Sequence, residues 1–441
     1  MGKGKLYRRL KNLAEENYLR LHYPGHKGRL SWLTDGSLDY TETYGTDNLL
    51  EPEEILKTIQ EDAARLYGVR ASFYGVGGST MALYAGLFSL TEVGERILVL
   101  RNAHKAIVQG AILRRLKVDS LELDFDEEWG IYTQVDLEKL EEALSARSYA
   151  ALVVTSPDYF GNIQNLPEIC ALAHQYGTRV LVDEAHGAHL AFTDLAEHSA
   201  VRHADLVVQS VHKSLSGLTG SALLHVAGDV DVERVAEWVH AFTTTSPSYL
   251  MLVSIEEALL EASEGDWEGL RRNLEALPQL AGDELLFYRP SPHDFTKIMF
   301  QRRGYTGEEL SQSLYERGIN VEMSLGPYAL AVASLSTTEE DVMRLAKTLR
   351  ELPPGRGSGE KTIYRPHPRR KIMEPYEAQE EGGLWLPPRE ALGKVSRRAL
   401  YAYPPGIPLL LPGEEITREL LEMEGLLGLK DGRMEIIHGK S

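Results

Sequence analysis

The sequence predicts an α/β protein whose large domain is built on a mostly parallel, doubly wound sheet. Two observations support this fold class. Short apolar runs rich in Val, Ile and Leu recur along the chain, which is typical of strands buried on both faces. Helix-length segments separate most of these runs, and parallel strands need such crossover connections. Because 441 residues are too many for one ordinary core, we expect two or more domains.

The first predicted helix lies in the segment EEILKTIQEDAARLYG, which starts at about residue 53. Its apolar residues Ile55, Ile59, Ala63 and Leu66 follow helical spacing. Gly68 is a typical C-terminal cap, because glycine adopts the left-handed backbone conformation at no steric cost. The sequence therefore predicts a helix that ends at this glycine.

Buried strands are then predicted, in chain order, in ERILVLRN, YAALVVTSP, TRVLVDEAHG, ADLVVQSVHK and SALLHV. Segments such as HKAIVQGAILRRL and LPEICALAHQYG are the expected helices between them. The last run, SALLHV, follows its predecessor too closely for a crossover helix, so we expect it to pair antiparallel. A long helix is predicted near residues 247–263, and a smaller α+β unit follows it.

This pattern divides the chain into five expected parts. They are an N-terminal arm at 1–52, a large sheet domain at 53–255, a small α+β domain at 256–350, a linker or long loop at 351–372, and a C-terminal segment at 373–441. The linker is assigned from its Pro, Gly and basic composition, LPPGRGSGEKTIYRPHPRRK.

Composition excludes several classes of partner. Lys and Arg total 47 against 65 for Asp and Glu, a formal charge of −18, and such an acidic surface repels nucleic acid and anionic membranes. We find no signal peptide and no apolar stretch of membrane-spanning length. The single cysteine, Cys170, cannot form an intrachain disulfide and is expected to be a small buried residue. We therefore expect a cytoplasmic protein.

A glycine-rich turn, Gly75-Val76-Gly77-Gly78-Ser79-Thr80, leads into a predicted helix. Backbone N–H groups at the start of a helix suit a phosphate, and the hydroxyls of Ser79 and Thr80 can add donors. Gly-Gly-Ser is also ordinary turn chemistry, so the turn alone leaves both interpretations open. It is not a nucleotide-binding P-loop, because no Gly-Lys-Ser/Thr follows the glycines.

Polar residues that directly follow the strands should meet at one edge of the sheet, where doubly wound proteins bind ligands. Asp183 is the first polar residue after TRVLV, and a buried carboxylate there needs a charged or hydrogen-bonding partner. A protonated pyridine nitrogen would meet both needs. A metal held by His186 and His189 is the competing interpretation, but zinc needs three or four converging ligands. We therefore expect no metal.

Lys213 follows the strand in ADLVVQ and stands beside Ser210 and His212. Burial at a strand end lowers the pKa of a lysine, which an imine-forming amine requires. His104, after the strand in RILVL, could stack flat on an aromatic cofactor, although a loop histidine with ordinary hydrogen bonds would look the same in the sequence.

This pattern, an aspartate at one strand end and Ser-x-His-Lys after a later strand, resembles the fold-type-I pyridoxal-phosphate enzymes. More narrowly, the chain resembles a short form of the Orn/Lys/Arg decarboxylase family over almost its whole length. The motifs that carry the resemblance are Pro24-Gly25-His26-Lys27, Asp39-Tyr40-Thr41-Glu42, Asp47-Asn48-Leu49, Gly78-Ser79-Thr80, Arg101-Asn102-Ala103-His104-Lys105, DEAHGAHLAF, SVHKSLSGLTGSALLHV, Thr244-Thr245-Ser246-Pro247-Ser248-Tyr249, Tyr305-Thr306-Gly307, Asn320-Val321-Glu322 and Tyr403-Pro404-Pro405-Gly406-Ile407-Pro408 through Pro412-Gly413-Glu414. The lead-in VGGST and the SLSG after the lysine differ in detail from the family pattern.

The resemblance implies a large domain that binds pyridoxal 5′-phosphate. Lys213 would hold the cofactor covalently as a Schiff base, Asp183 would pair with the pyridinium nitrogen, and His104 would stack on the ring. His186 would line the face of the ring near the aspartate. The phosphate would be held by Ser79, Thr80, Ser210 and His212.

The family also implies a shared active site. Thr245 and Ser246 would reach the cofactor of the neighbouring subunit, which requires a homodimer and leaves any higher oligomer open.

The implied reaction is decarboxylation of a basic amino acid to CO2 and an amine, with Lys213 or His212 returning a proton to Cα. Arginine is favoured, and lysine and ornithine stay open. Three carboxylates in the motifs are candidates for binding the distal cation of the substrate: Glu42, Glu322 and Glu414. The alternatives are another reaction of the same cofactor, such as transamination, and a non-catalytic protein of this fold.

Overall fold

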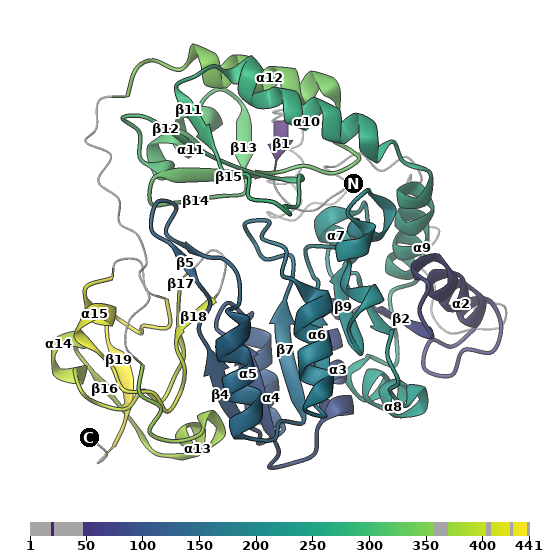
Figure 1. Ribbon diagram of the computed structural model, residues 1–441, viewed down its shortest axis with the longest axis vertical. Helices are drawn as coiled ribbons and strands as arrows, with labels where there is room; N and C mark the ends of the chain where they lie inside the picture. Colours follow the sequence, from purple (N-terminus) through teal and green to yellow (C-terminus); the bar gives the residue numbers. More distant parts are fainter. Residues whose placement is uncertain (1–18, 22–46, 356–368, 403–406, 424–426, 439–441) are drawn as a thin grey trace, which may run out of the picture.

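The structure is a computed structural model, and it describes residues 19–21, 47–355, 369–402, 407–423 and 427–438. Three units are visible: one around a seven-stranded sheet, one around a four-stranded sheet, and a C-terminal unit of short paired strands (Figure 1). Most of the predicted N-terminal arm lies outside the described residues, as do 356–368 of the predicted linker. No helix in the described part of the chain is long and apolar enough to cross a membrane.

The seven-stranded sheet is the base of the large unit. Its strands are, in spatial order, β2 (Ala71–Gly75), β10 (Ala222–Val226), β9 (Leu206–Ser210), β8 (Arg179–Asp183), β7 (Ala151–Thr155), β3 (Arg96–Leu100) and β4 (Lys117–Leu121). Strand β10 runs antiparallel to both of its neighbours, and the other neighbouring pairs in this sheet are parallel. The five predicted strands and the antiparallel pairing of SALLHV are therefore confirmed.

The strands that the sequence did not reveal, β2 and β4, are the two edges of the sheet. Residues of β4 such as Lys117 and Ser120 are exposed, because an edge strand is not covered on all sides. An edge strand therefore lacks the continuous apolar run on which the prediction depended.

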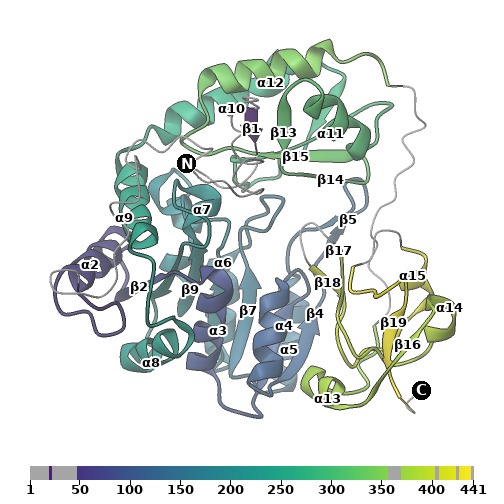
Figure 2. The ribbon, with the colours of Figure 1, turned by 180° about the vertical axis from the view of Figure 1, so that it is seen from behind.

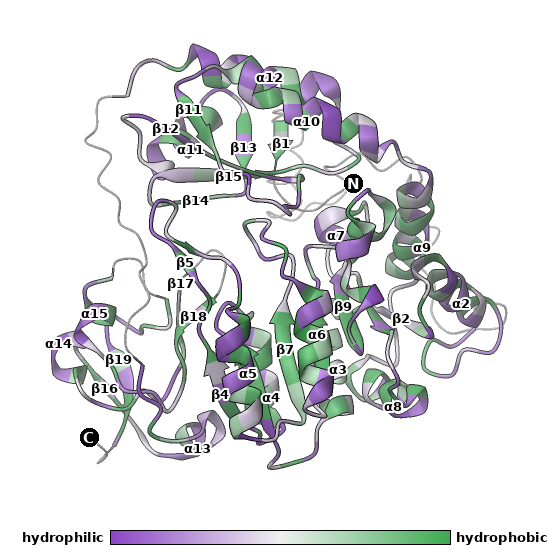
Figure 3. Cartoon of the chain, in the orientation of Figure 1, coloured by the Kyte–Doolittle hydropathy of each residue, from purple (hydrophilic) through white to green (hydrophobic). Residues whose placement is uncertain are grey.

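Helices cover both faces of this sheet. The helices on one face are α3 (Gly78–Leu90), α4 (Lys105–Leu113) and α8 (Val232–Phe242), and those on the other include α5 (Leu137–Ala146) and α6 (Leu166–Gln175). Successive residues of β8 show the alternation: Leu181 packs in the cluster of the first face, and Val180 and Val182 pack in the other. In Figure 3 the central strands are coloured as hydrophobic over most of their length, whereas helices such as α5 and α10 carry both colours. Cys170 is buried on α6, as expected.

The first predicted helix is α2 (Ile55–Tyr67), and Gly68 ends it with φ of 70°, which confirms the cap. The predicted buried face is only half correct. Ile59 and Ala63 are buried, but Ile55 is 51% exposed and Leu66 is 40% exposed. At about 100° per residue, both lie roughly a quarter-turn from the centre of the buried arc, which also contains Leu56 and Tyr67.

The small unit contains the antiparallel sheet β11-β12-β15-β14. Its strands are β11 (Leu285–Phe287), β12 (Lys297–Arg302), β14 (Met323–Leu325) and β15 (Tyr328–Val332), and its helices are α10 (Trp267–Ala281), α11 (Gly307–Tyr315) and α12 (Glu339–Glu351). Helices α10 and α12 lie side by side on it, as both ribbon views show (Figures 1 and 2). Strand β13 (Ile319–Val321) pairs in parallel with β1 (Leu19–Leu21).

Helix α9 (Tyr249–Glu264) leads from the large unit to the small one. It is the long helix expected near residues 247–263, and it is continuous across the predicted boundary at 255/256. We keep the division of the chain into domains as a proposal.

The C-terminal unit has its own small core around Leu400, Leu410 and Ile436. Its elements are α13 (Pro375–Glu380), β16 (Gly383–Leu386), α14 (Pro388–Ala391), β17 (Leu400–Ala402), β18 (Ile407–Leu410), α15 (Arg418–Leu421) and β19 (Met434–Ile437). It is attached to the edge of the large sheet by ion pairs, of which Lys371 Nζ to Asp119 Oδ1, 2.8 Å, is one. The pairs β16-β19 and β17-β18 are antiparallel.

Candidate active site

The carboxyl ends of the parallel strands surround a cavity of about 360 Å³. Strand β3 continues outward to β4, whereas β7 continues in the opposite direction to β8 and β9, so the chain reverses its order between β3 and β7. Ligands of doubly wound proteins bind at such a point. The cavity is lined by Gly78, Ser79, Thr80, Asn102, His104, Thr155, Asp158, Tyr159, Phe160, Asp183, Ala185, His186, His212, Lys213, Glu322 and Ile407.

Lys213 lies in the short helix α7 (Val211–Ser214), which begins directly after β9. Its Nζ atom is 3.0 Å from Nε2 of His186. Burial lowers the pKa of Lys213, the carboxylate of Asp183 opposes this effect, and the charge of Lys297 adds to it. An ε-amine that releases its proton more readily is a better nucleophile toward a carbonyl carbon.

Asp183 is the last residue of β8 and is 3% exposed. Its Oδ1 accepts a hydrogen bond from the backbone N–H of Ala185 at 3.2 Å. Burial raises the pKa of Asp183, and Lys213 opposes this effect. A carboxylate in this setting favours a cationic or hydrogen-donating partner within the cavity.

His104 caps the N-terminus of α4, where its Nδ1 accepts a hydrogen bond from the N–H of Ala106 at 3.2 Å. Burial lowers the pKa of His104 to about 4, and Lys213 and Lys105 add to this effect. The imidazole is therefore neutral near pH 7, and its orientation is set by the cap. A neutral flat ring at the wall of a cavity is suited to stacking on an aromatic ligand.

His186 and His189 do not form a joint site. His186 contacts Lys213 and lies edge-on to the ring of Tyr159, with a centroid distance of 4.9 Å. His189 is fully buried and donates from Nε2 to Asp294 Oδ1 at 2.9 Å. Within the described ranges, no three His, Cys, Asp or Glu side chains converge in a way that could hold a metal ion.

The predicted phosphate-binding residues lie at the start of α3 and around α7. Ser79 and Thr80 are in the first turn of α3, and Gly78 before them has φ of 74°, a backbone conformation that favours glycine. His212 also lines the cavity, and its Nδ1 is 3.1 Å from the carbonyl oxygen of Ser221. Ser210 is fully buried at the end of β9 and is not among the lining residues.

Thr245 and Ser246 are exposed in the loop between α8 and α9. They are not among the residues that line the cavity of their own chain. Of the ten predicted site residues, the structure therefore brings together seven and leaves three outside the lining, namely these two and Ser210. The seven are Ser79, Thr80, His104, Asp183, His186, His212 and Lys213.

The sequence prediction missed Asp158 and Tyr159, which follow β7 and line the cavity. Asp158 accepts hydrogen bonds from the backbone of Phe160 and from Asn162, and burial raises its pKa to about 6. Both follow a predicted buried strand within four residues, so a search slightly beyond the strand end would have found them.

The three carboxylates considered for the distal cation have different positions. Glu42 lies outside the described residues. Glu414 is buried and binds the guanidinium of Arg101 through both oxygens, at 3.1 and 3.0 Å, so it is already committed to a salt bridge. Glu322 lines the cavity and accepts a hydrogen bond from the Tyr159 hydroxyl.

The cavity fits pyridoxal 5′-phosphate. It combines a lysine of lowered pKa, a buried carboxylate and a helix N-terminus with adjacent hydroxyls. Several buried polar atoms at this edge, namely the Asn102 amide, Thr155 Oγ1 and Ser210 Oγ, make no hydrogen bond within the described part of the chain. Buried polar groups require partners, and a polar cofactor supplies them.

Fold and site together define a fold-type-I pyridoxal-phosphate enzyme. The solved lysine decarboxylase of Francisella novicida has this fold, with a TM-score of 0.75, 20% identity, and coverage of 89% of this chain and 73% of that one. The chain belongs to the Orn/Lys/Arg decarboxylase family, whose major-domain model matches residues 5–270.

Two curated relatives extend this similarity over nearly the whole chain. An arginine decarboxylase of Halalkalibacterium halodurans is 32% identical over 92% of this chain and 90% of its own length. One of Bacillus subtilis is 31% identical over 94% and 91%. The resemblance predicted from the motifs is thereby confirmed, and the protein is a pyridoxal-phosphate-dependent decarboxylase of basic amino acids.

Proposed function

We propose that the substrate is L-arginine and that each site residue has the role that the sequence predicted for it. The observation that carries this proposal is the presence of Lys213 and Glu322 in one cavity. The first is an amine of lowered pKa, and the second is a carboxylate that can pair with a distal cation. The curated relatives named above, with 31 and 32% identity, are arginine decarboxylases, which supports this choice.

Pyridoxal phosphate supplies an aldehyde that condenses with amines and a protonated ring that accepts the electron pair left by departing CO2. The side chain of Lys213 would hold it covalently, and Asp183 would keep a proton on the ring nitrogen. His104 would stack on the ring. His186 would line the face of the ring near Asp183. The phosphate would be held by Ser79, Thr80, Ser210 and His212.

The proton that replaces the lost carboxylate must come from a group that reaches the substrate Cα. Lys213 is suited to this role, because its amine is hydrogen-bonded to His186 and its pKa is lowered by burial. His212 is the second candidate, and its Nδ1 is engaged with the Ser221 carbonyl, which fixes the ring orientation.

Glu322 would bind the distal cation of the substrate. A guanidinium presents a planar pair of N–H donors that matches a carboxylate, whereas an ammonium is a point charge. Tyr159 holds one side of Glu322 by its hydroxyl and so restricts the orientation of the carboxylate.

The substrate assignment is tested by incubating cofactor-loaded protein with L-arginine, L-lysine and L-ornithine in turn and measuring the CO2 and amine released. We expect arginine to have the highest kcat/KM. A higher kcat/KM for either other amino acid contradicts the arginine assignment. Formation of a keto acid without CO2 would indicate an aminotransferase instead.

Two variants test the role of Glu322. Glu322→Gln removes the charge and should raise KM for arginine by about ten-fold or more, because a charged hydrogen bond to the substrate is lost. Glu414→Gln is the matched control, since this carboxylate is bound to Arg101. An unchanged KM for arginine in Glu322→Gln would contradict the proposal.

We further propose that the protein acts in the cytoplasm as a homodimer in which Thr245 and Ser246 reach the cofactor of the other subunit. Their exposure, away from the cavity of their own chain, is compatible with this role. Light scattering of the purified protein and fractionation of the source cells test the two statements directly.

Shared sites predict complementation. The variant Lys213→Ala and the double variant Thr245→Ala/Ser246→Ala should each be nearly inactive. After mixing and subunit exchange, random pairing should restore about a quarter of the wild-type activity, because half of the dimers are mixed and each of these has one complete site. No recovery in demonstrably mixed dimers would contradict a shared site.

A further inference from the structure

A buried set of charged and polar residues lies between the small unit and the active-site turn. His189 Nε2 donates to Asp294 Oδ1 at 2.9 Å, and Lys297 Nζ donates to Asp294 Oδ2 at 3.0 Å. All three side chains have no exposed surface. Although burial raises it, His189 and Lys297 together hold the pKa of Asp294 well below its usual value. The carboxylate is therefore ionised.

Stability alone is a weak explanation for such a set. Removing a lysine and a carboxylate from water costs free energy, and apolar side chains of similar size often stabilise a core as well or better. The group is nevertheless fully bonded around the carboxylate, since Thr296 donates to Asp294 Oδ1 from both its N–H and its hydroxyl. An arrangement this specific holds segments in register.

The group joins the small unit to a turn that forms part of the active-site wall. Lys297 begins β12 of the small unit, and His189 ends the turn that starts at Glu184 after β8. The same turn carries His186, whose Nε2 contacts the amine of Lys213.

The segment around Asp294 also holds the loop that follows β7. The N–H of Asp294 donates to the carbonyl of Gly161 at 3.0 Å, and His293 Nε2 is 3.1 Å from the carbonyl of Phe160. Because Phe160 lines the cavity, this segment braces two of its walls.

The charge of Lys297 acts at the same place. Burial lowers the pKa of His186 well below its usual value, and Lys213 and Lys297 add to this effect. Lys297 likewise contributes to the lowered pKa of Lys213. Both effects favour neutral groups, and an amine must be neutral to attack an aldehyde.

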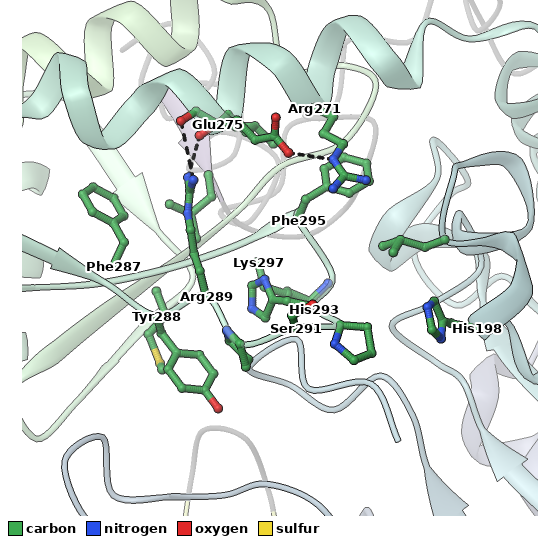
Figure 4. A pocket seen from close by; sticks show the side chains of 16 residues that line it. His198, Arg271, Glu275, Phe287, Tyr288, Arg289, Ser291, His293, Phe295 and Lys297 are labelled. Atoms are coloured by element: carbon green, nitrogen blue, oxygen red, sulfur yellow. Dashed lines mark hydrogen bonds and ion pairs between the residues drawn. The ribbon is translucent and has the colours of Figure 1, made fainter. Parts of the chain in front are cut away.

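Lys297 also lines a second cavity, of about 270 Å³ (Figure 4). The arginines that face it are already engaged: Arg271 with Glu275, and Arg289 with the backbone carbonyls of Leu274 and Glu275. We therefore assign no ligand to that cavity and look for the role of Lys297 on the side of the active site.

We propose that Asp294 and Lys297 are positioning residues of the decarboxylase, which act through His189 to keep His186 against the amine of Lys213. This inference rests on the proposed function of Lys213 as the cofactor-binding amine. Neither residue lines the catalytic cavity, so each acts through another group.

The chain contains a matched control at the opposite edge of the large sheet. Asp205 is a buried carboxylate that is bound, like Asp294, by a histidine and a cation: His174 Nε2 at 2.7 Å and Arg179 Nη1 at 2.9 Å. It precedes β9 and therefore lies at the amino end of that strand. Asp205→Asn removes the charge of a carboxylate that is bound in the same way, without reaching the cavity.

The test compares Asp294→Asn, Lys297→Met and their double variant with Asp205→Asn. The double variant removes both charges and leaves no lone buried charge, so it is the one expected to fold best. Two quantities are measured: kcat and KM for the amino acid, and the pH dependence of the rate at which cofactor-free protein takes up pyridoxal phosphate, followed by visible absorbance.

We expect kcat to fall by about ten-fold or more in the Asp294 and Lys297 variants, with KM changing much less, because a displaced His186 affects the reacting groups rather than the distal cation. In Lys297→Met the pH midpoint of cofactor uptake should move upward, since a positive charge near Lys213 has been removed. Asp205→Asn should keep the wild-type values of both quantities.

Wild-type kcat in the folded double variant, together with an unchanged pH midpoint in Lys297→Met, would overturn the proposal and leave these residues a structural role. The uptake measurement does not depend on which amino acid is turned over. If the wild type took up the cofactor but decarboxylated none of the three amino acids, the proposed substrate would fail while the positioning role would still be tested.

Discussion

Buried polar groups at the two ends of the seven-stranded sheet differ in whether they have hydrogen-bond partners within the chain. At the amino ends, Asp205 accepts hydrogen bonds from His174, Arg179 and the backbone of Val180. At the carboxyl ends, the amide of Asn102 and the hydroxyls of Thr155 and Ser210 are buried without a hydrogen bond in the described part of the chain. One such atom, Oγ1 of Thr178, lies near the amino ends as well.

The difference separates groups that serve folding from groups that serve a ligand. A carboxylate surrounded by its own chain has its charge balanced in the absence of any other molecule. Asp183 and Lys213, in contrast, are buried with shifted pKa values and few partners, which is typical of functional sites. Substitutions of residues that line the cavity should therefore change activity, and substitutions of buried groups that are bonded within the chain should change stability.

The largest expected effect is that of Lys213→Ala. Activity should fall by about 10³-fold or more, because the proposed covalent attachment point and the proposed proton donor are lost together. The visible absorbance of covalently bound cofactor should disappear, while circular dichroism keeps the wild-type spectrum. Retention of a substantial part of kcat would show that Lys213 is not required for the reaction, and the proposed difference between the two ends of the sheet would fail.

Asp183→Asn should lower kcat by about 10²-fold, because the ring nitrogen would lose the carboxylate that we propose keeps it protonated. The cofactor-free variant should be at least as stable as the wild type, since burial of the charged carboxylate is unfavourable and raises its pKa. Thermal unfolding measured beside kcat checks both statements. A clear loss of stability would mean that Asp183 serves the fold.

Glu184, next to Asp183, is fully buried, and its partners are Ser199, Ala200 and Gln209. Burial raises its pKa from 4.5 to about 8. Because the folded protein binds this proton more tightly than the unfolded chain, the contribution to stability is fully present below pH 4.5 and is lost as the pH rises through 8.

Glu184→Gln should therefore flatten the fall in the free energy of unfolding between pH 5 and 8 by about 3 kcal/mol relative to the wild type. Urea unfolding at several pH values measures this difference. Parallel curves for the two proteins would show that the proton is not bound on folding.

Asp205→Asn should have the smallest effect and the opposite kind. Its partners His174 and Arg179 are 42% and 45% exposed, so water compensates them in part, and we expect a loss of about 2 kcal/mol in the free energy of unfolding. The kcat of the folded enzyme should stay at the wild-type value. A lowered kcat at unchanged fold would remove the distinction between the two ends.

Most of the large sheet and much of the active site could be predicted from local patterns. Buried strands are continuous apolar runs, and the polar residues that follow them must meet at one edge. This reasoning located Asp183, His104 and Lys213, which the structure brings to one cavity. It failed at the edge strands and for Ile55 and Leu66, because exposure there depends on what the rest of the chain covers.

By itself, then, the amino-acid sequence determined the fold class, the order of the central strands along the chain and several polar residues that line the cavity, since each depends on short-range periodicity. Tertiary structure alone decided which carboxylate faces the cavity: Glu322 does, whereas Glu414 is bound to Arg101, more than three hundred residues away in the sequence. It also decided that Asp294 and Lys297 lie behind the turn that carries His186. Such contacts arise from the packing of one unit on another, and local sequence does not encode them.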